Sequence, residues 1–122
     1  MKRTLKALTL IGATLFAGST FAAKLVCDVY PKSGGQSFGN GTPHCNAIDF
    51  SFGNTTGGKY YLTGVNKPIK QVIWGGSANC SGGTQCSVTV RAYSNNNATA
   101  LILYKDFTYE SLSASMSYET GY

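Results

Sequence analysis

The chain has 122 residues, with ten basic residues against five acidic ones and a formal net charge of +5. Three of those bases, Lys2, Arg3 and Lys6, lie in the first six residues. Residues 23–122 therefore hold seven bases and five acids, which leaves a net charge of +2, and the seven bases are scattered along the chain. A nucleic-acid-binding surface needs a clustered basic stripe, so this composition argues against a nucleic-acid partner.

The amino-terminal segment has the pattern of a cleavable secretory signal. Its basic start is followed by an apolar run from Ala7 to Phe16 and by small residues up to Ala22. The apolar run is shorter than the roughly 20 residues that a membrane-spanning helix needs. We expect residues 1–22 to be a signal peptide that is cleaved after Ala22; the alternative is a retained amphipathic or membrane-anchoring helix. The expected product, residues 23–122, is secreted or periplasmic and keeps no stable membrane anchor.

Residues 23–122 predict a single all-β domain. They are rich in Gly, Ser, Thr, Asn and Tyr, the composition of strands joined by tight turns. The segment 31–43 is glycine-rich and predicts a loop with a hairpin turn at Asn40-Gly41. About seven short strands at this spacing indicate an antiparallel β-sandwich of two sheets. The expected strands cover residues 25–30, 48–52, 60–62, 69–74, 86–92, 98–104 and 111–118.

Alternation of apolar and polar residues predicts which side chains of two strands are buried. Segment 48–52 reads as a half-buried strand, in which we expect the apolar residues to face the core and the polar ones to face solvent. The apolar residues Ile48, Phe50 and Phe52 alternate there with Asp49 and Ser51. The last strand has the clearest pattern, because every second residue from 111 to 117 is serine. Period two places the serines on one face and the apolar residues on the other. Those apolar residues are Leu112, Ala114, Met116 and Tyr118.

Three segments carry a family resemblance. Phe50-Ser51-Phe52-Gly53-Asn54 is similar to an aromatic-Asp-Phe-Gly-Asp turn, with Ser51 in place of the usual Asp. Residues 86–90 are similar to a penultimate strand, and residues 98–103 with Asp106 to a closing strand. From Cys27 onward the chain thus resembles the immunoglobulin-like modules of secreted bacterial proteins, the group that includes polycystic-kidney-disease-type domains. The resemblance implies an immunoglobulin-like sandwich and no particular activity, since this architecture hosts many functions.

The four cysteines all lie beyond the expected leader, and their even number fits disulfides in an oxidising compartment. Local pairing joins Cys27 to Cys45 and Cys80 to Cys86, closures worth roughly 3.2 and 2.4 kcal/mol. The crossing alternative joins Cys27 to Cys86 and Cys45 to Cys80. Strand parity favours the crossing pairing, as does the bridge between sheets that the resemblance implies. The short spacers favour local pairing slightly, so both remain open. The spacing does not suit structural zinc, and we expect no metal.

Residues for catalysis are sparse. The single histidine, His44, lies between Pro43 and Cys45 in the glycine-rich loop, and no serine has the Gly-x-Ser-x-Gly context of a nucleophile elbow. Asp106 and Glu110 flank an expected turn and resemble ordinary solvated acids. An even cysteine count argues against a free thiol nucleophile. We therefore expect no enzyme activity and no cofactor.

Aromatic side chains supply the candidate binding residues. Rigid rings bind proteins and stack on sugars at little entropic cost, and the alternative is that they are ordinary strand and core residues. We expect a non-catalytic domain that binds an extracellular protein or glycan. A second hypothesis is an assembly component that joins a neighbour by strand addition at an exposed last strand, which lacks guarding Lys or Pro residues. A small hydrolase or inhibitor ranks lower. The candidate binding residues are Tyr60, Tyr61, Tyr93 and Trp74.

Overall fold

The computed structural model describes residues 22–32, 34–50 and 53–121. The predicted signal peptide lies outside these residues apart from Ala22. Within the described ranges every regular element is a strand, and no helix there is long and apolar enough to cross a membrane. The strands are β2 (Lys24–Tyr30), β3 (Gln36–Phe38), β4 (His44–Ile48), β5 (Thr55–Thr63), β6 (Ile69–Gly76), β7 (Gln85–Arg91), β8 (Asn96–Tyr104) and β9 (Tyr109–Glu119).

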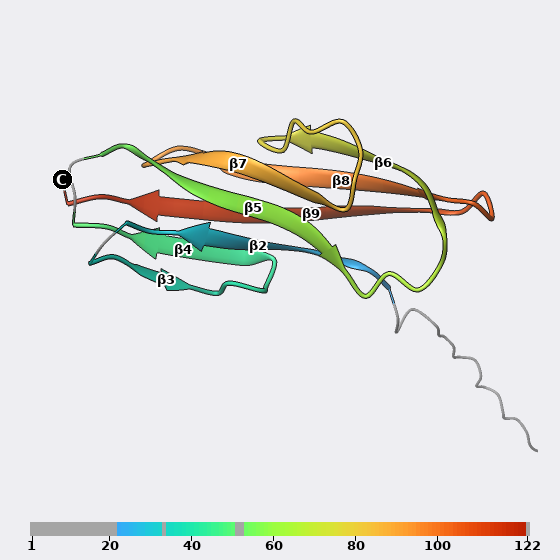
Figure 1. Cartoon of the computed structure of the whole chain (residues 1–122), viewed down its shortest axis with the longest axis horizontal. Helices are drawn as coiled ribbons and strands as arrows, with labels where there is room; N and C mark the ends of the chain where they lie inside the picture. The colour runs from blue at the N-terminus through green and yellow to red at the C-terminus, as the bar shows by residue number, and fades with distance from the viewer. Residues whose placement is uncertain (1–21, 33, 51–52, 122) are drawn as a thin grey trace, which may run out of the picture.

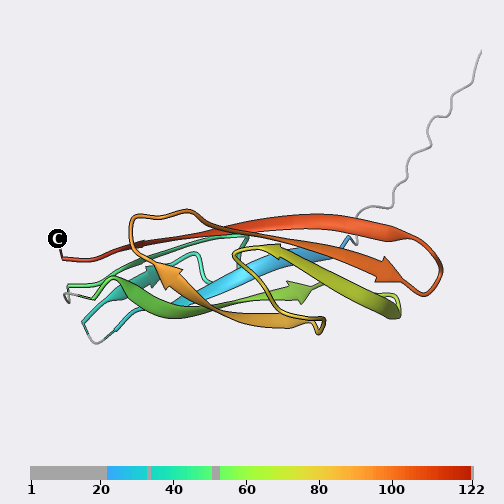
Figure 2. The ribbon, with the colours of Figure 1, turned by 90° about the horizontal axis from the view of Figure 1, so that it is seen from above.

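The strands form two sheets that pack face to face along an elongated molecule (Figures 1 and 2). One sheet has the order β2-β5-β7, and the other has the order β3-β4-β9-β8-β6. This arrangement confirms the all-β, immunoglobulin-like sandwich. One pair departs from the expected antiparallel pattern, because β4 and β9 run parallel. The loop after β2 carries the chain across to the second sheet, where β4 takes the side of β9 that β8 leaves free.

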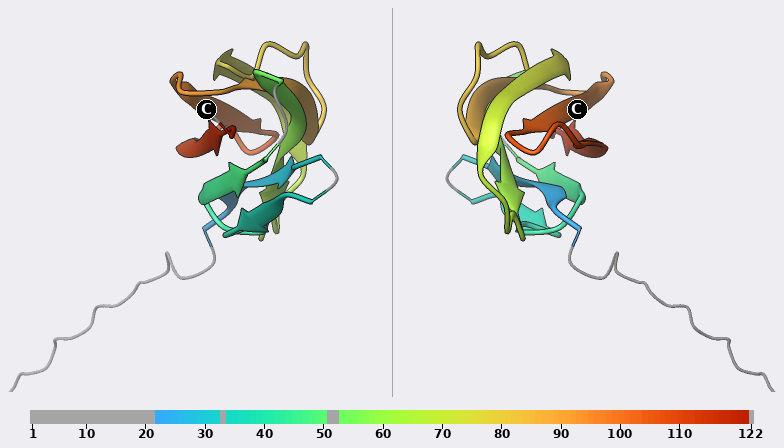
Figure 3. Two further views of the ribbon diagram at one scale, coloured as in Figure 1. Left: turned by 90° about the vertical axis from the view of Figure 1, so that its left-hand side faces the viewer. Right: turned by 90° about the vertical axis from the view of Figure 1, so that its right-hand side faces the viewer.

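The core lies between the two sheets, which face each other in the end views of Figure 3. Tyr60 is fully buried, and its hydroxyl donates a hydrogen bond to the Asn96 carbonyl. Trp74 is 8% exposed, and its Nε1 donates to the Gly82 carbonyl over 3.0 Å. In β9, Ala114, Met116 and Tyr118 are buried and the serines between them lie on the outer face, so the predicted alternation of the last strand is confirmed.

The segment 48–52 is not the strand that its alternation predicts. β4 ends at Ile48, and Asp49 is fully buried whereas Ile48 and Phe50 are exposed; residues 51 and 52 lie outside the described ranges. The cause is the phase of β4. Cys45 points inward to reach its disulfide partner, so Ala47 and then Asp49 follow on the same face. The predicted loop also contains a short strand, β3, which pairs with β4 as a hairpin around the expected turn.

Both disulfides are local, which confirms the preferred pairing. Cys27 bonds to Cys45 with a Cα–Cα distance of 6.1 Å, and Cys80 bonds to Cys86 at 5.7 Å. The crossing alternative is wrong. Cys27 and Cys86 face the same residue, Tyr60, from opposite sides of β5. A whole strand therefore separates the two cysteines by about 10 Å, beyond the reach of a disulfide.

We expect the two disulfides to stabilise the fold unequally. The double variant Cys27→Ser/Cys45→Ser removes a disulfide whose cysteines are 18 residues apart in the sequence, whereas Cys80→Ser/Cys86→Ser removes one whose cysteines are only 6 residues apart. Loop-closure entropy then predicts losses of about 3 and about 2 kcal/mol in the free energy of unfolding. Urea denaturation of the two double variants measures this difference. A larger loss from opening the shorter closure would contradict the prediction.

The buried Asp49 ties the chain's last strand to the start of the sandwich. Its Oδ2 accepts a hydrogen bond from the Tyr118 hydroxyl at 2.6 Å and from the Lys32 amide at 2.9 Å. The Asp49 amide in turn donates to the Glu119 carbonyl at 2.8 Å. Removing this carboxylate would take from the buried Tyr118 hydroxyl and from the Lys32 amide the oxygen that both donate to, which costs more than the net value of the bonds themselves.

Asp49→Ala should therefore lower the free energy of unfolding by about 2 kcal/mol, because the buried Tyr118 hydroxyl loses its hydrogen bond to this carboxylate. Asp49→Asn keeps an acceptor oxygen and should lose less. Glu119→Ala, which removes a neighbouring exposed carboxylate, should stay within about 0.5 kcal/mol of the parent chain. Chemical denaturation of the three variants tests the order, and equal losses for Asp49→Ala and Glu119→Ala would refute it.

Candidate functional site

The four aromatic residues predicted to bind a partner do not form one surface. Tyr60 and Trp74 belong to the core, and burial raises the pKa of Tyr60 to about 12. Tyr61 is half-buried and donates its hydroxyl to Asp28 Oδ1 over 3.2 Å. Tyr93 is 64% exposed and lies in the loop between β7 and β8. Only Tyr93 is mainly exposed, because alternation along β5 and β6 turns Tyr60 and Trp74 inward.

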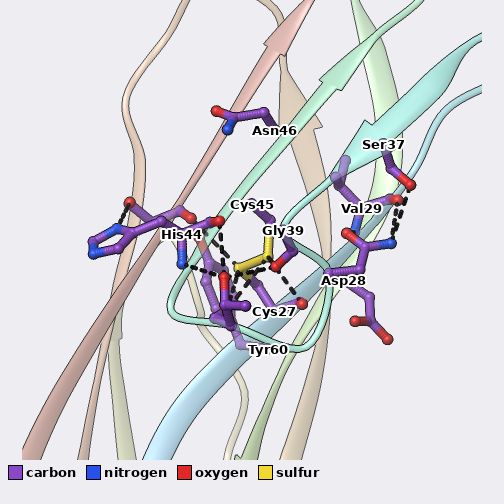
Figure 4. Close-up of a disulfide and its surroundings, with 12 residues drawn as sticks. Cys27, Asp28, Val29, Ser37, Gly39, His44, Cys45, Asn46 and Tyr60 are labelled. Carbon is purple, nitrogen blue, oxygen red and sulfur yellow. Dashed lines mark hydrogen bonds between the residues drawn. A yellow bond between two sulfur atoms is a disulfide. The ribbon is translucent and has the colours of Figure 1, made fainter.

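His44 forms a surface contact with a serine of the last strand. Its Nδ1 lies 2.9 Å from the Ser115 hydroxyl, on the outer face of the larger sheet and pointing away from the disulfide (Figure 4). No carboxylate bonds to His44 within the described residues, and no cluster of His, Cys, Asp and Glu there could hold a metal ion. The pair lacks the third group that orients a catalytic histidine.

The outer edge of β2 is covered by the chain that follows it. The Cys27 amide donates to the Thr42 carbonyl at 3.0 Å, and the Gly41 amide donates to the Cys27 carbonyl at 2.8 Å. The side chain of Asn40 pairs with the backbone of Val29: Oδ1 accepts from its amide and Nδ2 donates to its carbonyl, at 3.0 and 3.2 Å. This edge has no backbone groups left to pair with another strand at these positions.

The outer edge of β7 is only partly covered. Asn96 pairs with Arg91 as Asn40 pairs with Val29: its Oδ1 accepts from the Arg91 amide and its Nδ2 donates to the Arg91 carbonyl, both at 3.0 Å. The Arg91 backbone therefore points away from β5. Alternation along an antiparallel strand turns the amide and carbonyl groups of Thr89 and Ser87 in the same direction. No hydrogen bond within the described chain occupies those two amides.

A groove of about 640 Å³ runs along this free edge. Its walls are mostly polar. In an immunoglobulin sheet with strand order A-B-E-D, strands β2, β5 and β7 take the places of A, B and E. The groove thus lies on the side of β7 where a fourth strand would pair. It is lined by Ser87, Val88, Thr89 and Arg91 and by Gly76, Ser77, Asn79, Asn95 and Asn96.

The turn between β8 and β9 has an unusual residue at its tip. The Phe107 amide donates to the Tyr104 carbonyl at 3.1 Å, and the Tyr104 amide donates to the Thr108 carbonyl at 2.9 Å. Phe107 has φ of 70° and is 88% exposed. Glycine is the usual residue in this left-handed conformation, which costs other residues about 1–2 kcal/mol. This conformation could not be predicted from the sequence, because nothing in the Lys-Asp-Phe-Thr segment 105–108 indicates a positive φ.

Asp106 organises the same turn. Hydrogen bonds from the Thr108 hydroxyl and amide, and then the nearby Lys67 ammonium, lower the pKa of Asp106 to about 2. The Lys67 Nζ lies 3.2 Å from Asp106 Oδ2. A depressed carboxyl pKa stabilises the fold at pH values above the unfolded pKa of about 4, and this contribution is lost as the pH falls through about 2.

Thr108→Val should raise the pKa of Asp106 toward its ordinary value of 3.8, because it removes the hydroxyl that lowers this pKa most. Lys67→Met should raise the pKa less, since the hydrogen bond and the Coulomb attraction of the lysine each lower it less than either Thr108 group does. Carboxyl chemical shifts recorded by NMR across the acid range give both values. A larger rise in Lys67→Met than in Thr108→Val would contradict this ranking.

A scan against protein-family models and a search of curated proteins found no match for this chain.

Proposed function

We propose that residues 23–122 are a non-catalytic interaction domain that binds an extended segment of a partner polypeptide along β7. The observation that carries the proposal is the pair of free backbone amides, at Ser87 and Thr89, inside a groove of about 640 Å³. The two disulfides support a secreted or periplasmic location, since such bonds persist in oxidising compartments.

Strand addition gives the partner its affinity. A partner strand beside β7 would exchange hydrogen bonds with Ser87 and Thr89 and extend the three-stranded sheet to four strands. The polar walls of the groove suit small polar side chains on that strand. Arg91 has no ion-pair partner within the described chain, so it is free to bind a carboxylate of the partner.

The structure's edges favour β7 over the other strands. The predicted joining strand, β9, is not an edge, because it lies between β8 and β4. The β2 edge is covered, β3 has only three residues, and the register of β6 is interrupted between Ile69 and Gln71. Short, covered and bulged edges resist pairing with another chain, whereas β7 has no such protection at Ser87 and Thr89.

A polypeptide partner is better supported than a glycan. Sugar-binding surfaces use exposed aromatic faces, and Tyr60 and Trp74 are buried in the core. A small hydrolase has less support, since His44 and Ser115 lie outside the groove beside β7.

We also propose that the domain is of the polycystic-kidney-disease type. The two-sheet topology supports this, and the matched segments 86–90 and 98–103 form β7 and β8. The resemblance predicts that these segments are the penultimate and the closing strand, and this order is wrong because β9 follows both as the last strand. The matched turn 50–54 includes residues 51 and 52, which lie outside the described ranges.

Thr89→Pro should abolish strand addition while sparing the fold. Proline removes an amide that points away from β5, so the pairing of β5 with β7 is retained. Peptides selected from a random library on the oxidised domain should bind Thr89→Pro about tenfold more weakly, whereas Thr89→Ala, which keeps the amide, should bind like the parent. Equal binding of the selected peptides to all three proteins would defeat the proposal.

Amide hydrogen exchange provides an independent readout on the same complex. The Ser87 and Thr89 amides should exchange rapidly in the free domain and slowly when a selected peptide is bound. The amide of Val88, which points toward β5, should be protected in both states. Protection of Ser87 and Thr89 in the free domain would show that this edge is not open.

A further inference from the structure

The end of the molecule that carries the β8–β9 hairpin has an exposed apolar surface. Ile73 lies opposite Leu101, and Leu103 lies opposite Tyr109, so these four side chains are neighbours on the outer face of the larger sheet. Phe107 follows at the tip of the hairpin, which protrudes from one end of the molecule (Figure 1). We call these five residues the hairpin patch. Ile73 is 45% exposed, Tyr109 68% and Phe107 88%, so the patch presents apolar side chains to solvent.

The Phe107 amide closes the turn by donating to the Tyr104 carbonyl, but its exposed ring has no packing role among the described residues that would call for an aromatic side chain here. Tyr93 is the comparison, because these two are the described non-glycine residues with positive φ. The Tyr93 hydroxyl donates to the Thr120 carbonyl at 2.8 Å, and its amide donates to the Tyr118 carbonyl at 3.0 Å, so internal bonds hold it in place. The Phe107 ring instead meets the Lys70 ammonium, 6.0 Å from its centroid. An aromatic ring kept exposed in a strained turn points to a partner outside the chain.

The charge of the domain gathers at the same end. Lys24 begins β2 there, and Lys67, Lys70 and Lys105 surround the hairpin together with two acids, Asp106 and Glu110. The other charged residues of 23–122 balance one another, so the hairpin end holds the net charge of +2. They are Lys32, Lys59 and Arg91 against Asp28, Asp49 and Glu119.

The two acids at the hairpin end are engaged within the protein. Asp106 pairs with Lys67, and Glu110 accepts a hydrogen bond from the Tyr104 hydroxyl. The ammonium groups of Lys70 and Lys105 have no carboxylate partner in the part of the chain that the structure describes. Two unpaired cations thus flank an exposed phenyl ring, which is the combination that anionic lipid surfaces attract.

We propose that the hairpin patch docks reversibly on an anionic lipid bilayer. Phe107 enters the boundary between headgroups and acyl chains, and Tyr109 lies at headgroup level, where amphipathic rings are favoured. Lys70 and Lys105 keep their ammonium groups among the lipid phosphates. A protruding tip suits a deformable lipid surface.

Docking at this end leaves the groove beside β7 accessible. The groove includes Asn96, the first residue of β8, whereas the hairpin follows its last residue, Tyr104. A strand of nine residues separates the two by about 25–30 Å. The domain can therefore present a partner strand at one end while it rests on a membrane at the other.

Cosedimentation with vesicles tests the proposal on oxidised residues 23–122. The parent should bind vesicles of phosphatidylglycerol mixed with phosphatidylcholine more tightly than vesicles of phosphatidylcholine alone, and added salt should weaken the binding. Phe107→Asn should bind the anionic vesicles about tenfold or more weakly, since the ring is lost. Lys70→Gln/Lys105→Gln should remove most of the preference for phosphatidylglycerol.

Tyr93→Asn is the matched control, because it removes the other exposed aromatic residue at positive φ and Asn tolerates that conformation equally well. It should bind vesicles like the parent. The melting temperature of Phe107→Asn should be unchanged or higher, which separates a loss of binding from a loss of folding. Equal binding by the parent and Phe107→Asn would overturn the proposal, as would failure of the parent to bind anionic vesicles at low salt. Self-association that is lost in Phe107→Asn, without vesicle binding, would assign the patch to a protein contact and overturn it too.

Discussion

The disulfide between Cys27 and Cys45 is the constraint on which the rest of the structure depends. It joins β2 of one sheet to β4 of the other, and it sets the phase of β4 so that Ala47 and Asp49 face the core. β4 can then run parallel to β9, which gives the last strand a neighbour on each side. The same crossing brings Asn40 and Thr42 onto the outer edge of β2. One side of the sandwich is closed in this way, and the opening is left on the other side, beside β7.

Two asparagines use their side chains as short substitutes for a neighbouring strand. Asn40 occupies the backbone of Val29 on β2, and Asn96 occupies the backbone of Arg91 on β7. A primary amide carries one acceptor and donors on the same planar group, so it can satisfy both backbone groups of one residue. On β2 the loop also covers the backbone of Cys27, but on β7 the coverage is limited to Arg91. The β2 edge is therefore covered because Gly41 and Thr42, next to Asn40, also bond to it, whereas no residue near Asn96 bonds to the amides of Ser87 and Thr89 among the described residues.

Alternation along the sequence predicted much of the fold. It assigned the faces of β9 correctly, because β9 is an interior strand and its alternating apolar residues from Leu112 to Tyr118 face the core. It failed for residues 48–50, where a covalent bond at Cys45 fixes the phase and Asp49 is compensated by hydrogen bonds from Tyr118 and Lys32. Strand parity also favoured a disulfide between Cys27 and Cys86, because both side chains point into the core. Parity does not reveal that β5 lies between β2 and β7 and keeps the two cysteines apart.

The candidate sites could not be predicted in the same way. Whether the Ser87 amide is free depends on which strands pair, and the exposure of Phe107 depends on a turn conformation that its neighbours do not encode.

The placement of the cysteines relative to β9 has a consequence for the order in which the domain assembles. Every cysteine precedes residue 87, whereas β9 spans Tyr109–Glu119. Both covalent links can therefore close while the carboxyl-terminal hairpin has yet to dock. The larger sheet is completed only when β9 pairs with β8 and β4. An oxidised chain in which β9 has not yet paired would be a cross-linked intermediate with unpaired backbone groups along β8 and β4. Maturation would thus end with a non-covalent step made by the last part of the chain.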